Sequence, residues 1–228
     1  GQAARLDALQ ESDMTVEITP AAGLQAHAAA IAALYAATDN PNPFFAPWNL
    51  NAALGLLPEA AQLDFLLVSD ATGLAGLMPV ETASGYARLP VRYARTGMHR
   101  HCFLGTPLVR PGAEAAFLNA VINHAGLAGP FFQFRHLPAD GALAAAARAM
   151  PGAYEAASWE RACLASDLAY DSYLLANIRG KKRKEWRRLS SRLAEQGEVR
   201  FRVLERADQL TEWCYLFLAL EHEGWRGH

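Results

Sequence analysis

The sequence is poor in cysteine, and its three cysteines show neither metal-ligand nor disulfide spacing. Cys102, Cys163 and Cys214 are odd in number, far apart and in apolar surroundings. A disulfide framework or a zinc site needs more cysteines at closer spacing. All three are therefore predicted to be buried, unreactive free thiols.

Long apolar runs are also missing. A membrane-spanning helix needs about 18 to 20 apolar residues in a row, and Gln, His, Asn or Arg interrupts each Ala-rich stretch of this chain before that length. The first residues, GQAARLDALQESD, lack the basic and apolar regions of a signal peptide. We therefore expect a cytoplasmic protein without a membrane span, whose residues 1–13 form a tail.

The short motifs of common catalytic sites are absent: G-x-S-x-G, G-x-x-x-x-G-K-[ST], H-E-x-x-H and G-x-G-x-x-G. Their absence removes the usual routes to a hydrolase, an NTPase, a zinc protease or a dinucleotide-binding protein.

One short cluster contains metal-ligand residue types, namely His99, His101 and Cys102. On a strand the two histidines would share a face and the cysteine would point the other way. His124 and His136 are conceivable third ligands. Two hydrogen-bonded or surface histidines explain the cluster better, so no metal is expected.

Apolar sequence is plentiful enough for a sizeable core. The 228 residues are 52% hydrophobic and could form one large domain or two small ones. Hairpin-linked strands occur beside helices without strict strand–helix–strand alternation, which predicts an α+β fold with a mixed sheet flanked by helices. The expected strands are 14–19, 63–70, 74–83, parts of 87–109, 129–138, 154–166 and 198–205. The expected helices are 24–38, 48–57, 113–126, 143–150, 172–196 and 207–225.

Positive charge is concentrated in one segment of an otherwise acidic chain. Residues 179–192 contain eight basic residues and one acid, Glu185, whereas the whole chain has a net charge of −2. The rest of the chain contains 13 of the 21 basic residues and 22 of the 23 acidic ones. Such asymmetry indicates either a solvated basic helix face or an anion-binding surface.

Within this segment, apolar residues recur at helical spacing and form one stripe. The stripe consists of Leu175, Ile178, Trp186, Leu189 and Leu193. Lys182 falls on the stripe, so it either extends past it to solvent or points into a cleft that holds an anion. Arg183 and Arg187 are four positions apart on one flank and could grip a phosphate or carboxylate. The alternative is a solvated face in which Lys181 pairs with Glu185.

A turn-rich loop, residues 39–47, carries aromatic residues that solvent would not favour alone. Phe44, Phe45 and the following Trp48 are either core residues or the rim of a site. A strand, turn and helix pattern also occurs near both ends of the chain, in VEIT with LQAHAAAIAALY and in FRVL with LTEWCYLFLALE. This repeat favours two similar domains, with chance similarity as the alternative.

The segment SYLLANIRGKKRKEWRRLSSRLAEQGEVRFRVLE, followed by LTEWCYLFLALEHEGWRG, resembles the GNAT-superfamily acyltransferases of the CelD-like type, which are relatives of the Fem peptidyltransferases. The resemblance covers residues 170–227 in detail, and PNPFFAPWNLNAAL, GLMPV and LGTPLV match less specifically. It implies two GNAT-like domains, the first without a functional acyl-donor site and the second binding acyl-CoA, with the acceptor between them. Residues 14–168 would form the first domain, and residues 169–228 the start of an apparently truncated second one.

The resemblance also implies roles for particular residues. Arg183 and Arg187 fall on the two arginines of the K-x-R-x-x-x-R pattern of the Fem relatives, where the helix borders the substrate cleft. The expected acceptor-binding residues are Lys182, Arg183, Arg187, Trp48 and Trp225, whereas Trp186 is expected in the core. Acetyl-CoA or another acyl-CoA would be the co-substrate, bound mainly beyond residue 228, because the Q/R-x-x-G-x-G/A loop is missing. No catalytic residue is assigned.

The leading hypothesis is therefore part of an N-acyltransferase that acts on an amine of a small or cell-envelope-related acceptor. The alternative is a non-enzymatic module that binds RNA or another anion through residues 179–192. The sequence pI of about 6.4 argues against nucleic acid. A third interpretation treats the basic segment as an interface clamp.

Overall fold

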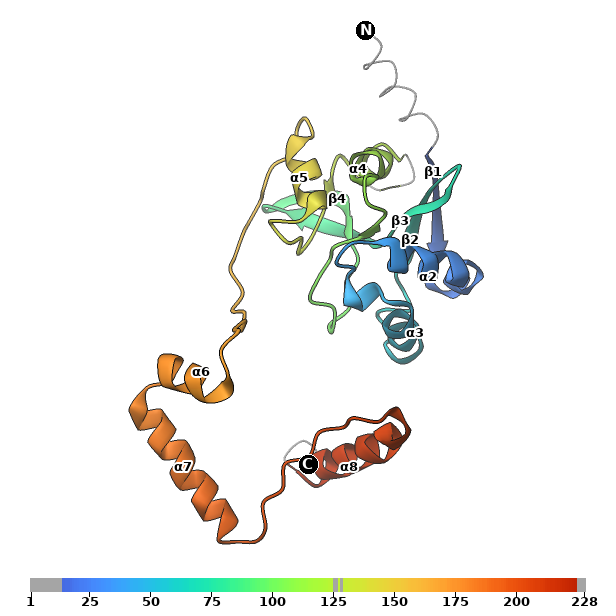
Figure 1. The fold of residues 1–228 in the computed structure, drawn as a ribbon. Helices are drawn as coiled ribbons and strands as arrows, with labels where there is room; N and C mark the ends of the chain where they lie inside the picture. Colours follow the sequence, from blue (N-terminus) through green and yellow to red (C-terminus); the bar gives the residue numbers. More distant parts are fainter. Residues whose placement is uncertain (1–13, 125–126, 128, 225–228) are drawn as a thin grey trace. The chain divides into compact units, whose positions relative to one another are not determined.

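The computed structural model describes residues 14–124, 127 and 129–224. The chain divides into two units, Gly1–Ser158 and Trp159–His228. In its described residues the first unit has the α+β fold predicted from the sequence, with an open, mixed sheet of six strands flanked by helices (Figure 1).

The strand order of the sheet is β1-β2-β3-β4-β6, and β5 pairs with β3. All pairs are antiparallel except β4 with β6, which is parallel. β3 is long enough for β4 and β5 to pair with successive parts of it. The strands are β1 (Thr15–Pro20), β2 (Asp64–Asp70), β3 (Gly73–Tyr86), β4 (Leu89–Thr96), β5 (Leu108–Val109) and β6 (Phe132–Gln133).

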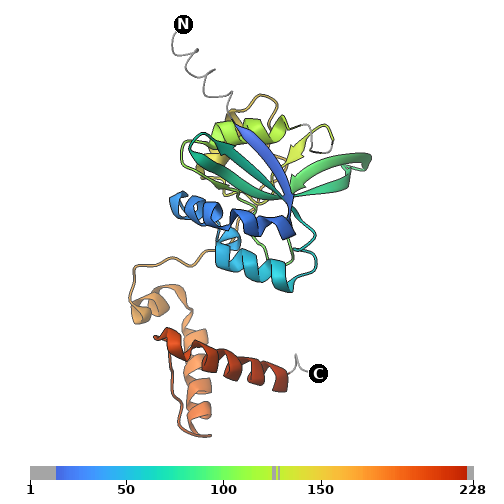
Figure 2. The ribbon, with the colours of Figure 1, turned by 90° about the vertical axis from the view of Figure 1, so that its right-hand side faces the viewer.

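Helices cover both faces of the sheet (Figures 1 and 2). The first face packs against 3₁₀ helix η1 (Ala21–His27), α2 (Ala28–Ala37), 3₁₀ helix η2 (Pro43–Phe45) and α3 (Pro47–Leu56). The second packs against α4 (Glu114–Ile122) and α5 (Ala142–Ala149).

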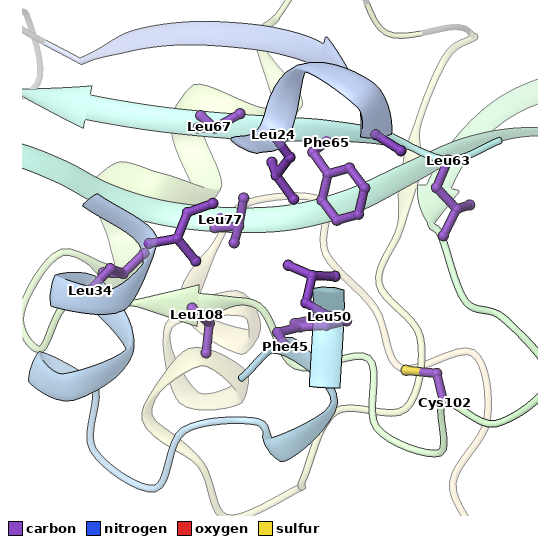
Figure 3. Packing of buried hydrophobic residues seen from close by; sticks show 12 residues of the cluster. Leu24, Leu34, Phe45, Leu50, Leu63, Phe65, Leu67, Leu77, Cys102 and Leu108 are labelled. Carbon is purple, nitrogen blue, oxygen red and sulfur yellow. The ribbon is translucent and has the colours of Figure 1, made fainter. Parts of the chain in front are cut away.

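The inner strand β2 explains why both faces of the sheet are covered by helices. Successive side chains of a strand point to opposite faces. Phe65 and Leu67 join the core beneath α2 and α3, where Leu24, Leu34, Phe45 and Leu50 surround them (Figure 3). Leu66 and Val68 point into the second core. The strand predicted over 63–70 is confirmed, and its continuous apolar run is typical of a strand buried on both faces.

Helix α4 lies close to the sheet because β3 has a glycine beneath it. A Cβ at Gly76 would lie 2.2 Å from the ring of Phe117. Phe117 itself is fully buried in the second core. Only glycine leaves room for this ring against the strand.

The second unit contains helices in its described part and no strand. They are α6 (Tyr170–Asn177), α7 (Gly180–Ala194), 3₁₀ helix η3 (Ala207–Gln209) and α8 (Leu210–Glu223). No residue described in this unit is buried. Its apolar side chains therefore form no core of their own among the described residues.

Two strand predictions are wrong. Residues 154–166 and 198–205 form no strand, although the second segment alternates polar and apolar residues. An extended segment becomes a strand only when another strand satisfies its backbone hydrogen bonds. Neither segment has such a neighbour among the described residues.

The single helix predicted over 172–196 is also wrong, because the chain breaks it between α6 and α7. Ile178 and Arg179 are not helical, with ψ of 123° and 139°. Asn177 and Gly180 flank the break, and both have low helix propensity. The strong periodicity across the segment hid this local weakness.

Among the helices of the described residues, none combines the length and apolar character needed to cross a bilayer.

Candidate functional site

Helix α7 carries most of the basic residues that the sequence singled out. Lys182 Nζ lies 3.3 Å from a carboxylate oxygen of Glu185, so Glu185 pairs with Lys182 and not with Lys181. Both side chains of this pair are about half exposed, at 55% and 46%. Solvent therefore screens the pair, and its contribution to stability is small.

Arg183 contacts the preceding helix. Its Nη1 donates to the carbonyl oxygens of Leu174 at 3.1 Å, Leu175 at 3.2 Å and Ile178. The last carbonyls of a helix have no partner within that helix, and a cation there also interacts favourably with the helix dipole. Arg183 therefore caps α6 and fixes the angle between α6 and α7.

Four exposed cations follow one another along the side of α7 at spacings of three or four residues. This basic ridge consists of Lys181, Lys184, Arg188 and Arg192. None of the four forms an ion pair with an acid in the part of the chain that the structure describes. Arg187 is exposed as well and lies between the ridge and the flank of Arg183. These side chains keep their full positive charge available to a partner.

The apolar stripe lies on another side of α7. Trp186, Leu189 and Leu193 are 39%, 48% and 55% exposed. Trp186 is the least exposed of the three, but the expectation that it lies in a core is not met among the described residues. Lys182 is adjacent to this stripe and reaches Glu185 instead of an anion-binding cleft.

The two tryptophans proposed as walls of an acceptor site have different outcomes. Trp48 lies in the first turn of α3 in the first unit, where its ring packs edge-on against Tyr35 at a centroid distance of 5.2 Å and stays 68% exposed. The structure thus places it on a surface. Trp225 lies outside the described residues.

The turn-rich loop before Trp48 is held by a buried asparagine. Asn42 Nδ2 donates to the carbonyl oxygens of Leu104 and Thr106 at 3.0 and 2.9 Å, and its Oδ1 accepts from Phe44 N at 3.0 Å. Phe45 is buried in the core beneath α2 and α3. The loop aromatics therefore divide into a core residue, Phe45, and a surface residue, Trp48.

The histidine and cysteine cluster lies on the loop 97–107. His101 N donates to His99 Nδ1 at 3.3 Å, and burial lowers the pKa of His99, with a further lowering from nearby His101. Cys102 Sγ donates to the carbonyl oxygen of Leu104. Among the described residues no group of three His, Cys, Asp or Glu side chains could hold a metal ion.

The prediction of three buried thiols is correct for one cysteine. Cys102 is buried, whereas Cys163 and Cys214 are exposed. The described residues of the second unit form no core for the same reason: apolar neighbours in sequence do not bury a side chain unless the segments pack together.

A second charged cluster, which the sequence did not reveal, lies on the sheet of the first unit. Glu81 Oε1 accepts from Arg95 Nε at 2.6 Å and from Arg135 Nη1 at 3.3 Å. Arg95 pairs with Glu81 on β3 and with Gln133 on β6, so the three side chains form one row across three strands. We call Glu81, Arg95, Gln133 and Arg135 the sheet cluster.

The segment after β6 keeps Arg135 in place. The backbone N of Arg135 donates to Thr96 Oγ1 at 3.3 Å, and Gly105 N donates to the carbonyl oxygen of His136 at 3.3 Å. A Cβ at Gly105 would lie 2.1 Å from the Arg135 carbonyl oxygen, so this close approach requires glycine. The residues of the cluster are up to 54 positions apart, and strand register together with the segment after β6 brings them together.

Comparison of the chain with family models, with curated proteins and with solved structures found no match.

Proposed function

We propose that this chain is part of a GNAT-type N-acyltransferase that transfers an acyl group from acyl-CoA to an amine of a small or cell-envelope-related acceptor. The observation that carries the proposal is the segment 172–227, whose K-K-R-K-E-W-R-R run resembles the CelD-like enzymes. The mixed sheet of the first unit supports it, because the resemblance implies such a sheet for the first domain. The contribution of this chain is acceptor binding.

In this proposal the two arginines of the K-x-R-x-x-x-R pattern have different tasks, because their surroundings on α7 differ. Arg187 is exposed and has no acidic partner among the described residues, so it contacts the anionic part of the acceptor. Arg183 holds the end of α6 and positions the helix. The resemblance also implies acceptor contacts for Lys182 and Trp225 in the same segment.

The reaction requires a neutral amine. Its nitrogen attacks the thioester carbonyl, the carbon–sulfur bond breaks, an amide forms, and the proton lost by the amine leaves with the CoA thiol. The sequence has no Q/R-x-x-G-x-G/A loop for the CoA pyrophosphate. No residue of this chain is therefore assigned to acyl-CoA, to the base or to the oxyanion.

The direct test measures amine-dependent release of the CoA thiol by the intact protein that contains this chain. The donors are acetyl-CoA and longer acyl-CoAs, and the acceptors are a panel of amines that carry a carboxylate or a phosphate. Release that depends on the amine and saturates with it supports the proposal. Release equal to the amine-free background with every member of the panel overturns it.

A second candidate is a module that binds RNA through the basic ridge. The observation in its favour is that the four ridge cations have no acidic partner in the described part of the chain. Such binding to single-stranded RNA would weaken with salt by a log–log slope of about −0.7 per phosphate contacted. Replacing the ridge by Gln should abolish that binding, and a flat salt profile excludes this candidate.

A further inference from the structure

The sheet cluster of the first unit carries more positive charge than its single carboxylate balances. Two guanidiniums share one oxygen atom, Glu81 Oε1. No other acid pairs with Arg95 or Arg135 among residues 14–124, 127 and 129–224. The cluster therefore keeps a net charge of about +1 and most of its N–H donors have no protein acceptor there.

These guanidiniums are only partly exposed. The side chains of Arg95, Arg135 and Glu81 are 32%, 27% and 27% exposed, whereas Arg200 and Arg206 in the second unit are 72% and 70% exposed. Reduced access of water strengthens the field of a charge toward an incoming anion. A cation at this depth binds an anion more strongly than a fully solvated one.

From this geometry we propose that Arg95, Arg135 and Gln133 form a binding site for the oxyanion group of a small molecule, a carboxylate or a phosphate. Planar guanidiniums bind both groups through paired N–H donors. Gln133 stands beside Arg95 in the same row and adds an amide N–H. Glu81 orients both guanidiniums and does not touch the ligand.

An apolar wall lies next along the same face. Phe131 is two residues before Gln133, and its ring stacks on Tyr93 at a centroid distance of 4.8 Å. Tyr93 is two residues before Arg95 on β4, so both rings share the face of the cluster. Phe131 is half-buried and covers the buried Tyr93. This wall favours a ligand with a flat or apolar part beside its oxyanion.

The alternative is that Glu81, Arg95 and Arg135 form an ion-pair triad that only stabilises the sheet. The variant Glu81→Gln distinguishes an anion site from such a triad. An anion site loses a repelling charge in this variant, so it binds the anion more tightly. A purely structural triad shows no anion binding before or after the change.

The experiment titrates the intact chain with inorganic phosphate and, separately, with succinate, at constant ionic strength set by sodium chloride. The NMR signals of the amides in β4 and β6 report binding. Saturable shifts with phosphate indicate a phosphate-bearing ligand, and those with succinate a carboxylate-bearing one. Arg95→Gln with Arg135→Gln should weaken binding by about tenfold or more, as expected for two lost charge-assisted contacts.

Arg148→Gln is the matched control, because Arg148 lies on α5 of the same unit and pairs with Glu155 at 3.6 Å, not with the sheet cluster. It should leave both titrations unchanged. Absence of saturable shifts with both probes, or equal affinity in the double variant, overturns the proposal. Neither result bears on acyl transfer, since the readout is binding alone.

Discussion

Arg183 donates a hydrogen bond to the carbonyl oxygen of Ile178, the residue at which the chain leaves α6. It also donates to the carbonyl oxygens of Leu174 and Leu175. A single guanidinium of α7 therefore caps the C-terminus of α6. The basic segment thus contains a structural cation as well as free ones.

Removal of the Arg183 cap should loosen α6. In Arg183→Ala the last carbonyls of α6 lose their charged donor, and we expect local opening of the helix to become easier by about 1 kcal/mol. Hydrogen exchange of the α6 amides measures this. Arg192→Ala, which removes a ridge cation from the same helix, is the control. Unchanged exchange in the Arg183 variant would show that the contact does not stabilise α6.

Arg187 should affect the acceptor and not the acyl donor. In the amine-dependent assay, Arg187→Gln removes a charge that would face the anionic acceptor, so KM for the acceptor should rise about tenfold while KM for acyl-CoA stays the same. Arg192→Gln serves as the matched change on the ridge. Equal acceptor kinetics in the Arg187 variant and the wild-type protein would remove Arg187 from the acceptor site.

The elements that sequence reasoning located correctly are those whose pattern is local. The continuous apolar run of β2 and the helically spaced apolar residues of α4 are examples, because each pattern lies within a single element. The break between α6 and α7 at Ile178 and Arg179 was not predicted, because the apolar stripe keeps its helical spacing across it.

The sheet cluster could not be found in this way. Glu81, Arg95 and Arg135 are neighbours only through strand register and the segment after β6. In the sequence alone, an isolated charged residue on a strand cannot be told from a solvated one. The one usable signal was that Glu81 and Arg95 occupy facing positions in adjacent strands of a hairpin, which suits a cross-strand ion pair.

Acid should weaken the first unit through Asp70. Hydrogen bonds from Thr72 and the guanidinium of Arg110 lower the pKa of Asp70 to about 2, against the opposing effect of burial. Because the folded-state pKa is depressed, this stabilisation is complete above the unfolded value of about 4 and is lost as the pH falls toward 2.

The test compares urea unfolding of the wild-type protein and Asp70→Asn from pH 6 to pH 2. The wild-type protein should be more stable by about 1 kcal/mol at pH 6, and the difference should shrink as the pH falls from about 4 to 2. A difference that is independent of pH would show that the carboxylate charge is not what stabilises this turn.

The cysteines should react at different rates. Burial raises the pKa of Cys102 to about 11, so at pH 8 it is a thiol shielded from reagents, whereas Cys163 and Cys214 are exposed. Ellman's reagent should titrate two thiols rapidly in the native protein and the third only after denaturation. Mass spectrometry after alkylation identifies the slow residue, and rapid labelling of Cys102 would contradict its burial.

Substitutions in the turn between β3 and β4 should stabilise the first unit. Tyr86 pairs with Leu89, so Ala87 and Arg88 form a two-residue turn, and both have positive φ, 49° and 70°. This left-handed conformation is unfavourable for residues with a Cβ, whereas Asn-Gly suits it. Ala87→Asn with Arg88→Gly should stabilise the first unit by about 1 kcal/mol, measured by thermal unfolding. Arg88→Ala alone removes the charge but keeps the Cβ, so it should give no such gain; an equal gain would attribute the effect to charge and not to backbone strain.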